Sequence, residues 1–422
     1  MSQTTQTDII TIGDVATRLP NFITKVPHIL SGLKQAYLRT PASPTGLGIA
    51  FEKAVKRNPQ GIALLFEDQS YSYRALNEWA NQIAHYYLSL GAKKGDVIAV
   101  MVENRPELIA TIVALAKIGV TIALVNTSQV GKILAHSINL VNPIAVIAGE
   151  EVRAAIDEAR PELKVPQDRF HWFADQETRK HAGTAPKDYV NLAQQIDQFP
   201  KFNPSTTRTV TGKDGLFYIY TSGTTGKPKG AMLSYRNFFS NAIAGSISFQ
   251  ITEKDRFIVF LPMFHSFTLS IMVLLPMFTC SSIVIVRSVF PFANVLKQTL
   301  LKQVTIFLGV PTLYNALLKA KIPWYFMWFN KVRIFISGSA PLSEQSLNEF
   351  NAKFKKATLL EGYGLSECSP AVSVNRLDRQ KALSVGLPLP SYEVKIVNEE
   401  MMEVKVGEVG EIMVKEIGRA HV

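Results

Sequence analysis

The amino-acid sequence predicts an α/β fold with two mostly parallel sheets, each covered by helices, and a small β subdomain. Short, continuously apolar runs alternate with segments whose apolar residues recur at helical spacing. This alternation is typical of parallel sheets with helices on both faces. A polar connection at residues 180–204 separates two such series, and two strand-like runs near the C-terminus have no helix between them.

The first series begins at about residue 51. Its clearest strand is the segment GDVIAVM at 95–101, where a glycine turn precedes a run with a buried-strand pattern. In order, we expect strands at 62–66 and 70–73, a helix at 73–90, a strand at 95–101, a helix at 106–118, a strand at 121–125, a helix at 129–140 and a strand at 144–148.

The second series starts with an apolar strand that leads into a run rich in glycine, threonine and lysine. Its last helix is preceded by Pro341 and Ser343, which suit a helix N-cap region. We expect strands at 216–220, 257–261, 305–308 and 332–337, helices at 292–303, 311–320 and 343–355, and two antiparallel strands at 391–397 and 409–414.

These patterns divide the chain into consecutive parts. They are an N-terminal extension at 1–50, a first α/β subdomain at 51–204, a second at 205–385, the start of the small β subdomain at 386–415 and a tail at 416–422. Residues 16–40 are apolar with scattered basic side chains and no acidic one. Such a basic amphipathic segment can lie on an anionic membrane or pack on the protein's own surface, and both interpretations stay open.

Composition narrows the class of protein. The 422 residues, 47% of them hydrophobic, suffice for a large core. A net charge of +11 suits nucleic acid, an anionic membrane or anionic small molecules, but no nucleic-acid-binding motif is present, so we expect no nucleic-acid partner. Cys280 and Cys368 are too few for a disulfide framework and fit a reducing compartment. The apolar stretches 108–125 and 269–286 read as helix, turn and strand rather than as membrane spans.

Residues 220–230 read YTSGTTGKPKG and carry the strongest functional signal. Glycines let backbone amides approach a phosphate, while hydroxyls and lysines add donors and charge. The run is not a Walker A loop, because Gly223 and Gly226 have only two residues between them and Pro228 follows Lys227. We therefore expect a site for a polyphosphate here. An ordinary solvated turn is the alternative, and eleven residues in this order argue against it.

Three further motifs follow in order. Residues 336–342 read ISGSAPL, 361–367 read EGYGLSE and 407–412 read GEVGEI. With the polyphosphate run, they make the chain resemble the acyl-adenylate-forming, AMP-binding superfamily of acyl-CoA synthetases, luciferases and peptide-synthetase adenylation domains. The resemblance extends from about residue 51 to about residue 415. It implies the large N-terminal domain of a long-chain fatty acyl-CoA synthetase.

The resemblance implies ATP, Mg²⁺ and coenzyme A as cofactor and co-substrates, and a fatty acid as substrate. Its implied catalytic residues are Lys229, His265 and Glu367, and Thr221 and Glu367 are the implied Mg²⁺ ligands, since Mg²⁺ usually takes one or two carboxylates plus phosphate oxygens. The implied nucleotide-binding residues are Thr221, Ser222, Gly223, Thr224, Thr225, Gly226, Lys229, Gly338, Ser339, Ala340, Glu361, Gly362, Tyr363, Gly364 and Ser366.

By the same resemblance, Tyr363 stacks on adenine, Ser366 contacts the α-phosphate and His265 borders the carboxylate pocket. Phe267, Leu269 and Val310 are expected to line an acyl tunnel. Taken alone, His265 among apolar residues would be a core histidine, and Glu367 a solvated surface residue.

The family continues past the GEVGEI element with a ribose-binding aspartate, a hinge and a C-terminal domain that carries a catalytic lysine. We expect these parts to be missing here, and the chain to be weakly active or inactive alone. The last six residues, IGRAHV, are expected to be artefactual. The half before the polyphosphate run resembles the fatty-acid-transport-protein type, and the half after it bacterial medium- or long-chain synthetases; one gene and two joined halves both stay open.

Three functions remain open at this point. The first is a fatty acid–CoA ligase in the cytoplasm, with peripheral association on the inner face of the cytoplasmic membrane. The second is an acyl- or aryl-acid AMP ligase that loads another acceptor. The third is a non-enzymatic acyl-binding or transport protein, against which an intact polyphosphate run argues. Acyl chain length and oligomeric state do not follow from the sequence.

Overall fold

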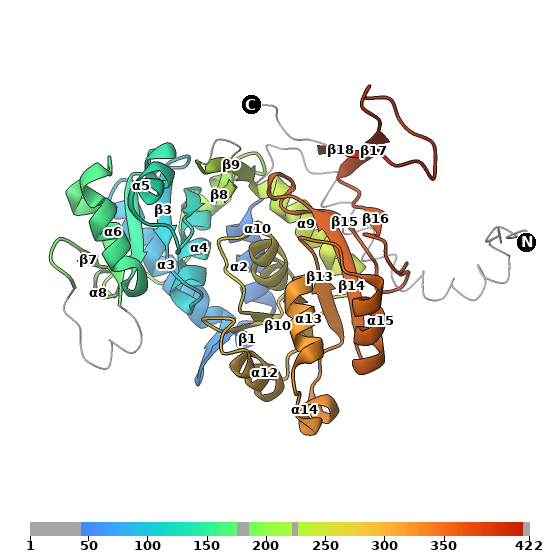
Figure 1. Cartoon of the computed structure of the whole chain (residues 1–422). Coiled ribbons are helices and arrows are strands. Elements are labelled where there is room, and N and C mark those ends of the chain that lie inside the picture. The colour runs from blue at the N-terminus through green and yellow to red at the C-terminus, as the bar shows by residue number, and fades with distance from the viewer. Residues whose placement is uncertain (1–43, 175–184, 222–226, 417–422) are drawn as a thin grey trace, which may run out of the picture. The chain divides into compact units, whose positions relative to one another are not determined.

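The computed structural model describes residues 44–174, 185–221 and 227–416 (Figure 1). Residues 222–226 of the polyphosphate run, most of the predicted N-terminal extension and the tail from 417 lie outside these ranges. The predicted extension, 1–50, ends inside the first described helix, α2 (Leu47–Arg57), whose Phe51 is fully buried. The packed fold therefore starts before residue 51.

The first sheet has seven strands in the order β7-β6-β5-β3-β4-β8-β9. All neighbours pair in parallel except β8 and β9, which form an antiparallel hairpin. The strands are β3 (Val97–Met101), β4 (Thr121–Leu124), β5 (Ala145–Gly149), β6 (Phe170–Phe173), β7 (Val190–Asn191), β8 (Gly215–Thr221) and β9 (Lys229–Ser234).

The second sheet has nine strands in the order β16-β15-β14-β13-β12-β10-β11-β1-β2. Its central pairs are parallel, and antiparallel pairs close both edges. The strands are β1 (Ile62–Phe66), β2 (Gln69–Ser72), β10 (Arg256–Val259), β11 (Ser282–Ile285), β12 (Ile306–Gly309), β13 (Ile334–Ser337), β14 (Thr358–Gly364), β15 (Ala371–Val374) and β16 (Leu387–Pro388).

Helices cover both faces of each sheet. Side chains of β3 alternate between two clusters: Ile98 and Val100 join the central core, while Ala99 and Met101 face an outer cluster shared with α5 and α6. The helices are α3 (Tyr73–Ser89), α4 (Pro106–Ile118), α5 (Gly131–Leu140), α6 (Arg153–Ala159), α8 (Leu192–Ile196), α9 (Tyr235–Ser248), α10 (Ser266–Thr268), α11 (Leu275–Thr279), α12 (Phe292–Leu301), α13 (Pro311–Lys319), α14 (Trp324–Phe329) and α15 (Glu344–Lys353).

Shorter turns complete the chain between these elements. A π-helical segment, η5 (Leu269–Leu274), joins α10 to α11. The 3-10 turns are η1 (Glu150–Val152), η2 (Arg160–Glu162), η3 (Gln167–Arg169), η4 (Ser205–Thr209) and η6 (Ser366–Cys368). Local signals fix the long helices: the Ser72 hydroxyl caps α3 by accepting from Ala75 N at 3.1 Å, and Gly119, with φ of +71°, ends α4.

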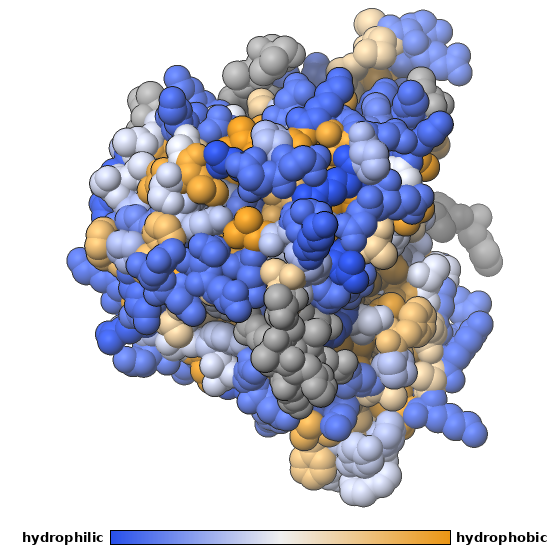
Figure 2. Space-filling view, turned by 90° about the vertical axis from the view of Figure 1, so that its left-hand side faces the viewer, coloured by the Kyte–Doolittle hydropathy of each residue, from blue (hydrophilic) through white to orange (hydrophobic). Residues whose placement is uncertain are grey.

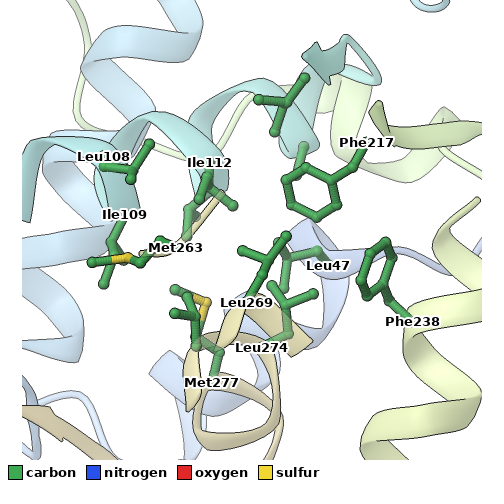
Figure 3. Packing of buried hydrophobic residues seen from close by; sticks show 14 of the residues in the cluster. Leu47, Leu108, Ile109, Ile112, Phe217, Phe238, Met263, Leu269, Leu274 and Met277 are labelled. Atoms are coloured by element: carbon green, nitrogen blue, oxygen red, sulfur yellow. The ribbon is translucent and has the colours of Figure 1, made fainter. Parts of the chain in front are cut away.

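The central core lies between the two sheets. Leu108, Ile109 and Ile112 of α4 face Met263, Leu269 and Met277 around the η5 region, with Leu47, Phe217 and Phe238 beside them (Figure 3). The helix that ends at Thr279, the left-handed Cys280 and buried β11 confirm the expected helix, turn and strand at 269–286. In the part of the chain that the structure describes, no helix is both long and apolar enough to cross a bilayer.

The sheets do not divide the chain at residue 204, where the sequence patterns place a boundary. Strands β1 and β2, from the predicted first subdomain, pair with β11 in the nine-stranded sheet. Strands β8 and β9, from the predicted second subdomain, complete the seven-stranded sheet beside β4. Strand pairing depends on hydrogen bonds between distant segments, which alternation along the chain does not reveal. Near the C-terminus, β17 (Tyr392–Val397) and β18 (Glu411–Glu416) form the expected antiparallel unit.

Candidate active site

The polyphosphate run connects the two strands of the β8–β9 hairpin. Thr221 ends β8 and pairs with Lys229 at the start of β9. Thr221 is half-buried and Lys229 is exposed, while Ser222, Gly223, Thr224, Thr225 and Gly226 lie outside the described residues. A Walker A loop opens a helix, whereas this run leads into a strand, so the expected distinction from that motif holds.

The second part of the site lies at the carboxyl edge of the nine-stranded sheet. Parallel strands β13 and β14 both end there, so the ISGSAPL and EGYGLSE motifs come side by side. Gly338 follows β13, and a Cβ there would lie 2.7 Å from Cζ of Phe267. Ser339 has φ of +70° and is exposed, as is Ala340. Small residues thus let α10 approach the strand end closely.

A cavity of about 230 Å³ opens between these strand ends and α10. Its lining comes from α10, η5, the end of β13, β14 and β15. The sequence-predicted residues that line it are Phe267, Gly338, Ser339, Glu361, Gly362, Tyr363, Gly364 and Ser366. Two motifs separated in sequence therefore meet in one cavity, as a nucleotide pocket built from both requires.

Glu361 is one of the residues that line this cavity. Its Oε1 accepts a hydrogen bond from the backbone N–H of Leu342 at 3.3 Å, which ties β14 to the turn after β13. Partial burial raises the pKa of the Glu361 carboxyl above its usual range. Tyr363 is half-buried. It packs against the central core and also lines the cavity.

Ser366 and Glu367 lie on the 3-10 turn η6, directly after β14. The Ser266 hydroxyl of α10 donates to the Ser366 hydroxyl at 3.1 Å. The η6 turn also packs against β9, the strand that Lys229 begins. This contact brings the carboxylate turn next to the strand that begins within the polyphosphate run, although more than a hundred residues separate the two in sequence.

Among the described residues, no group of three or more His, Cys, Asp or Glu side chains is arranged to hold a metal ion. A protein site built of carboxylates alone is thus not formed in this part of the chain. The half-buried Glu367 fits the other way of binding Mg²⁺, in which one carboxylate combines with phosphate oxygens and water.

Asn241 of α9 holds η6 in place, and the sequence analysis did not identify it. Its Nδ2 donates to the Cys368 carbonyl at 3.2 Å and to the Tyr392 hydroxyl at 3.1 Å. Its Oδ1 accepts from Ala371 N at 2.9 Å, and the Tyr392 hydroxyl also donates to the Cys368 carbonyl. The only sequence signal is a polar side chain on a mostly apolar helix.

His265 stands at the N-cap position of α10, with its ring 4.6 Å from that of Phe264. His265 is exposed, and partial desolvation by its neighbours lowers its pKa, which favours the neutral imidazole. His265 is not among the residues that line the 230 Å³ cavity, although Phe267, two residues on, is. Its expected role at the carboxylate therefore stays a prediction.

The residues expected to line an acyl tunnel lie in different places. Leu269 is fully buried in the central core, where Figure 3 shows it beside Leu47 and Leu274. This core lies on the inner side of the nine-stranded sheet. Val310 packs against the cluster on the outer side of that sheet. Of the apolar residues in the π-helical η5, Ile271 reaches the cavity. Such π-helical insertions occur frequently at functional sites.

Comparison with known proteins agrees with this geometry. Residues 51–420 match the model of the AMP-binding enzyme family, and the chain belongs to that family. It is 26% identical over 383 residues to the medium/long-chain-fatty-acid–CoA ligase FadD6 of Mycobacterium tuberculosis, covering 89% of this chain and 60% of the relative. It is 28% identical over 388 residues to the long-chain-fatty-acid–CoA ligase of Escherichia coli, covering 86% and 68%.

A 2-succinylbenzoate–CoA ligase of Bacillus velezensis is equally similar, with 28% identity over 345 residues that cover 80% of this chain and 63% of the relative. Among solved structures, the anthranilate CoA ligase AuaEII with anthranoyl-AMP aligns with a TM-score of 0.81 and 21% identity, covering 89% of this chain and 70% of that one. The N-terminal domain of FACL13 of Mycobacterium tuberculosis aligns with a TM-score of 0.74 and 22% identity, covering 88% and 89%.

The expected family and fold are thus confirmed. The chain spans about 60% of the first of these relatives and 68% of the second. Fatty-acid and aryl-acid ligases match about equally well, so similarity alone leaves the acid undecided.

Proposed function

We propose that this chain is the nucleotide-binding part of an ATP-dependent ligase that converts a long-chain fatty acid to acyl-AMP and then to acyl-CoA. The observation that carries the proposal is one cavity shared by the ends of β13 and β14, whose lining residue Ser366 lies on η6, the turn that packs against β9 of the polyphosphate hairpin. Similarity to fatty-acid–CoA ligases supports the acid, and the polyphosphate run supports ATP over simple acyl binding.

In the proposed first step, a carboxylate oxygen of the acid attacks the α-phosphorus of ATP, and the bond to pyrophosphate breaks. Tyr363 stacks on adenine against a wall of small residues, and Glu361 keeps that wall in place through Leu342 N. Ser366 donates a hydrogen bond to the α-phosphate, and Lys229 balances charge that moves to pyrophosphate. In the second step, the thiol of coenzyme A attacks the acyl carbonyl and AMP leaves.

Glu367 and Thr221 are the residues that would hold Mg²⁺ against the phosphates. When bound, the ion neutralises phosphate charge and orients the triphosphate. The packing of η6 against β9 supports this pairing, because it brings the Glu367 turn to the hairpin that Thr221 and Lys229 close. The two cysteines of the chain, Cys280 and Cys368, are buried and form no disulfide, which fits the cytoplasm, where ATP and coenzyme A are supplied, as the proposed location.

An aromatic acid is the second candidate substrate. The matching aryl-acid ligases favour it, as does the separation of Leu269 and Val310 onto opposite sides of a sheet, which weakens the expected acyl tunnel. The two candidates share the nucleotide chemistry and differ only in the carboxylate pocket.

The test is exchange of labelled pyrophosphate into ATP with a panel of acids, including palmitate, octanoate, benzoate and 2-aminobenzoate. Exchange should be fastest with a long-chain fatty acid. Faster exchange with an aromatic acid would favour the second candidate. Because this chain is expected to be weakly active or inactive alone, the assay uses a form that continues into the C-terminal domain. Acid binding without any exchange in such a form, with ATP bound, would contradict ligase chemistry.

A further inference from the structure

The short helix α14 carries four aromatic side chains that remain exposed, here called the aromatic patch: Trp324, Tyr325, Trp328 and Phe329. Their exposed fractions are 71%, 46%, 71% and 59%. Positions 324 and 328, and 325 and 329, are one helical turn apart and therefore lie on one side of the helix. The opposite side is anchored, because Phe326 is 4% exposed and Met327 packs against the same outer cluster.

Such a patch is unusual on a water-exposed surface. Folded monomers rarely gather large apolar side chains at one place unless that place contacts a partner or a membrane. The face formed by the outer helices of the seven-stranded sheet shows the ordinary arrangement, with small apolar groups separated by hydrophilic residues (Figure 2). The helix that carries the aromatic patch packs against α12 and is joined to α13 and β13 by short connections.

The surroundings of the patch are basic. No acidic residue occurs in the sequence between Asp255 and Glu344. Exposed lysines flank α14 before and after it and at the ends of α13 and α15, and Lys356 Nζ donates to the Trp328 carbonyl at 3.3 Å. No carboxylate of the described residues forms an ion pair with these lysines, which are Lys319, Lys321, Lys331, Lys355 and Lys356.

The patch lies at the opposite end of the nine-stranded sheet from the candidate active site. Helices α13 and α15 start at the carboxyl edge, where the cavity opens, and run back toward the amino edge, where α14 follows α13. In Figure 1, α14 is accordingly at the lower end of the view, beyond β13 and β14. A surface that bound this patch would leave the nucleotide cavity open to water.

We propose that α14 is an interfacial anchor, which places its aromatic side chains among the headgroups of an anionic lipid bilayer. Tryptophan and tyrosine favour this interface, and neighbouring lysines are attracted by lipid phosphates. The basic surroundings favour a bilayer over a second copy of this chain, because two patches facing each other would bring their lysines together. The proposal concerns a surface distinct from the cavity and does not depend on the reaction catalysed there.

Intrinsic fluorescence gives a direct test, because two of the four tryptophans are in the patch. Trp172 is fully buried and Trp79 is half-buried against Tyr71. Vesicles of phosphatidylcholine with phosphatidylglycerol should shift the emission to shorter wavelength, and lipids brominated near the headgroup end should quench it. Vesicles of phosphatidylcholine alone should do so much less, and added salt should weaken the response.

Two variants complete the test on the full chain. Trp324→Ser with Trp328→Ser should lower partitioning onto anionic vesicles in a flotation assay by about tenfold or more. The matched control is Phe290→Ser, which removes a 76% exposed aromatic residue at the start of α12, near the opposite edge, and should partition like the parent chain. ATP binding should be unchanged in all three proteins.

Equal partitioning of the double variant and the parent would overturn the proposal and assign any binding to another segment, since residues 1–43 are identical in both. Equal partitioning onto neutral and anionic vesicles would overturn the role of the lysines. A patch-dependent dimer in analytical ultracentrifugation, without vesicle binding, would assign the patch to self-association instead.

Discussion

Two regions of the molecule satisfy their polar groups in opposite ways. In the first region, the Lys117 side chain of α4 is fully buried, and protein groups accept the hydrogen bonds of its ammonium group. Its Nζ donates to Asn77 Oδ1 at 2.6 Å, Asn81 Oδ1 at 2.6 Å and Asn203 Oδ1 at 2.8 Å, and lies 3.5 Å from Glu52 Oε1. Burial lowers the pKa of Lys117 to about 8, so the ammonium is still charged at neutral pH.

At the carboxyl edge of the nine-stranded sheet, polar groups instead face a cavity. Glu361 accepts from one backbone donor, and Tyr363 and Ser366 are half-buried in the cavity lining. Glu367 is half-buried on η6, directly after Ser366. Polar groups in the two regions therefore serve different purposes. Those that are hydrogen-bonded within the protein contribute to stability, whereas those that face a cavity are available to a ligand.

The largest expected effect is on stability. Lys117→Met removes the cation and leaves Glu52 and three amide oxygens without it, which should lower the free energy of unfolding by about 3–5 kcal/mol. Urea denaturation measures the free energy of unfolding, and Lys132→Met, at an exposed position of α5, is the control. ATP affinity of the folded fraction should not change. A stable variant with weakened ATP binding would contradict the assignment of Lys117 to stability.

The reverse pattern is expected for Glu367→Ala. Loss of a carboxylate that holds Mg²⁺ at the phosphates should slow adenylation by about 10²–10³-fold. The melting temperature should stay the same, because the half-buried Glu367 side chain lies on the short η6 turn and belongs to none of the hydrophobic clusters. Pyrophosphate exchange measured across a Mg²⁺ titration tests this, with exposed Glu400→Ala as control. Unchanged exchange at saturating Mg²⁺ would show that Glu367 is not the ligand.

The buried His171 of β6 makes the stability region sensitive to acid. Its Nε2 lies 3.1 Å from the Tyr86 hydroxyl, and burial lowers its pKa to about 4. The unfolded chain, with a histidine pKa near 6.5, binds the proton more tightly, so stability should fall as pH drops from about 6.5 to about 4, by up to ~3 kcal/mol. His171→Gln should flatten this part of the pH profile. An equally steep profile would exclude His171 as its source.

The smallest expected effect concerns Asn241, which lies where the two kinds of region meet. The side-chain amide of Asn241 has protein hydrogen-bond partners at both its nitrogen and its oxygen, and these bonds hold the turn that carries Glu367. Asn241→Ala leaves the buried Cys368 carbonyl and Ala371 amide with fewer partners and should lower the free energy of unfolding by about 1–3 kcal/mol. If positioning matters, KM for MgATP should also rise, roughly three- to tenfold. Exposed Asn294→Ala should change neither quantity; stability loss with an unchanged KM would leave Asn241 a structural role only.

Local patterns predicted most elements well. The helix expected at 106–118 is α4, Pro106–Ile118, and the strand expected at 62–66 is β1, Ile62–Phe66. These succeed because apolar periodicity and helix-terminating residues act within a few turns. The residues at 338–339 and 361–364, which the motifs assign to one nucleotide site, do line one cavity, since each motif is continuous in sequence and ends a strand. Their roles in binding stay predictions.

Residues whose role depends on a distant segment were not found. Asn241 became visible only through its bonds to Cys368 and Ala371, and Leu269 and Val310 were expected together although a sheet separates them. The aromatic patch on α14 was likewise not singled out, because its sequence reads as a buried apolar run. Only its exposed fractions distinguish it.

By itself, the sequence determined the α/β class, the order of most helices and strands, the adenylate-forming family and the two motifs that line the cavity. Each of these depends on spacing within a short segment. The tertiary structure decided that β1 and β2 join the nine-stranded sheet while β8 and β9 join the other, and that η6 packs against β9. It also decided which polar groups are hydrogen-bonded within the protein and which face the cavity. These outcomes depend on hydrogen bonds and burial between residues far apart in the chain, which no local pattern encodes.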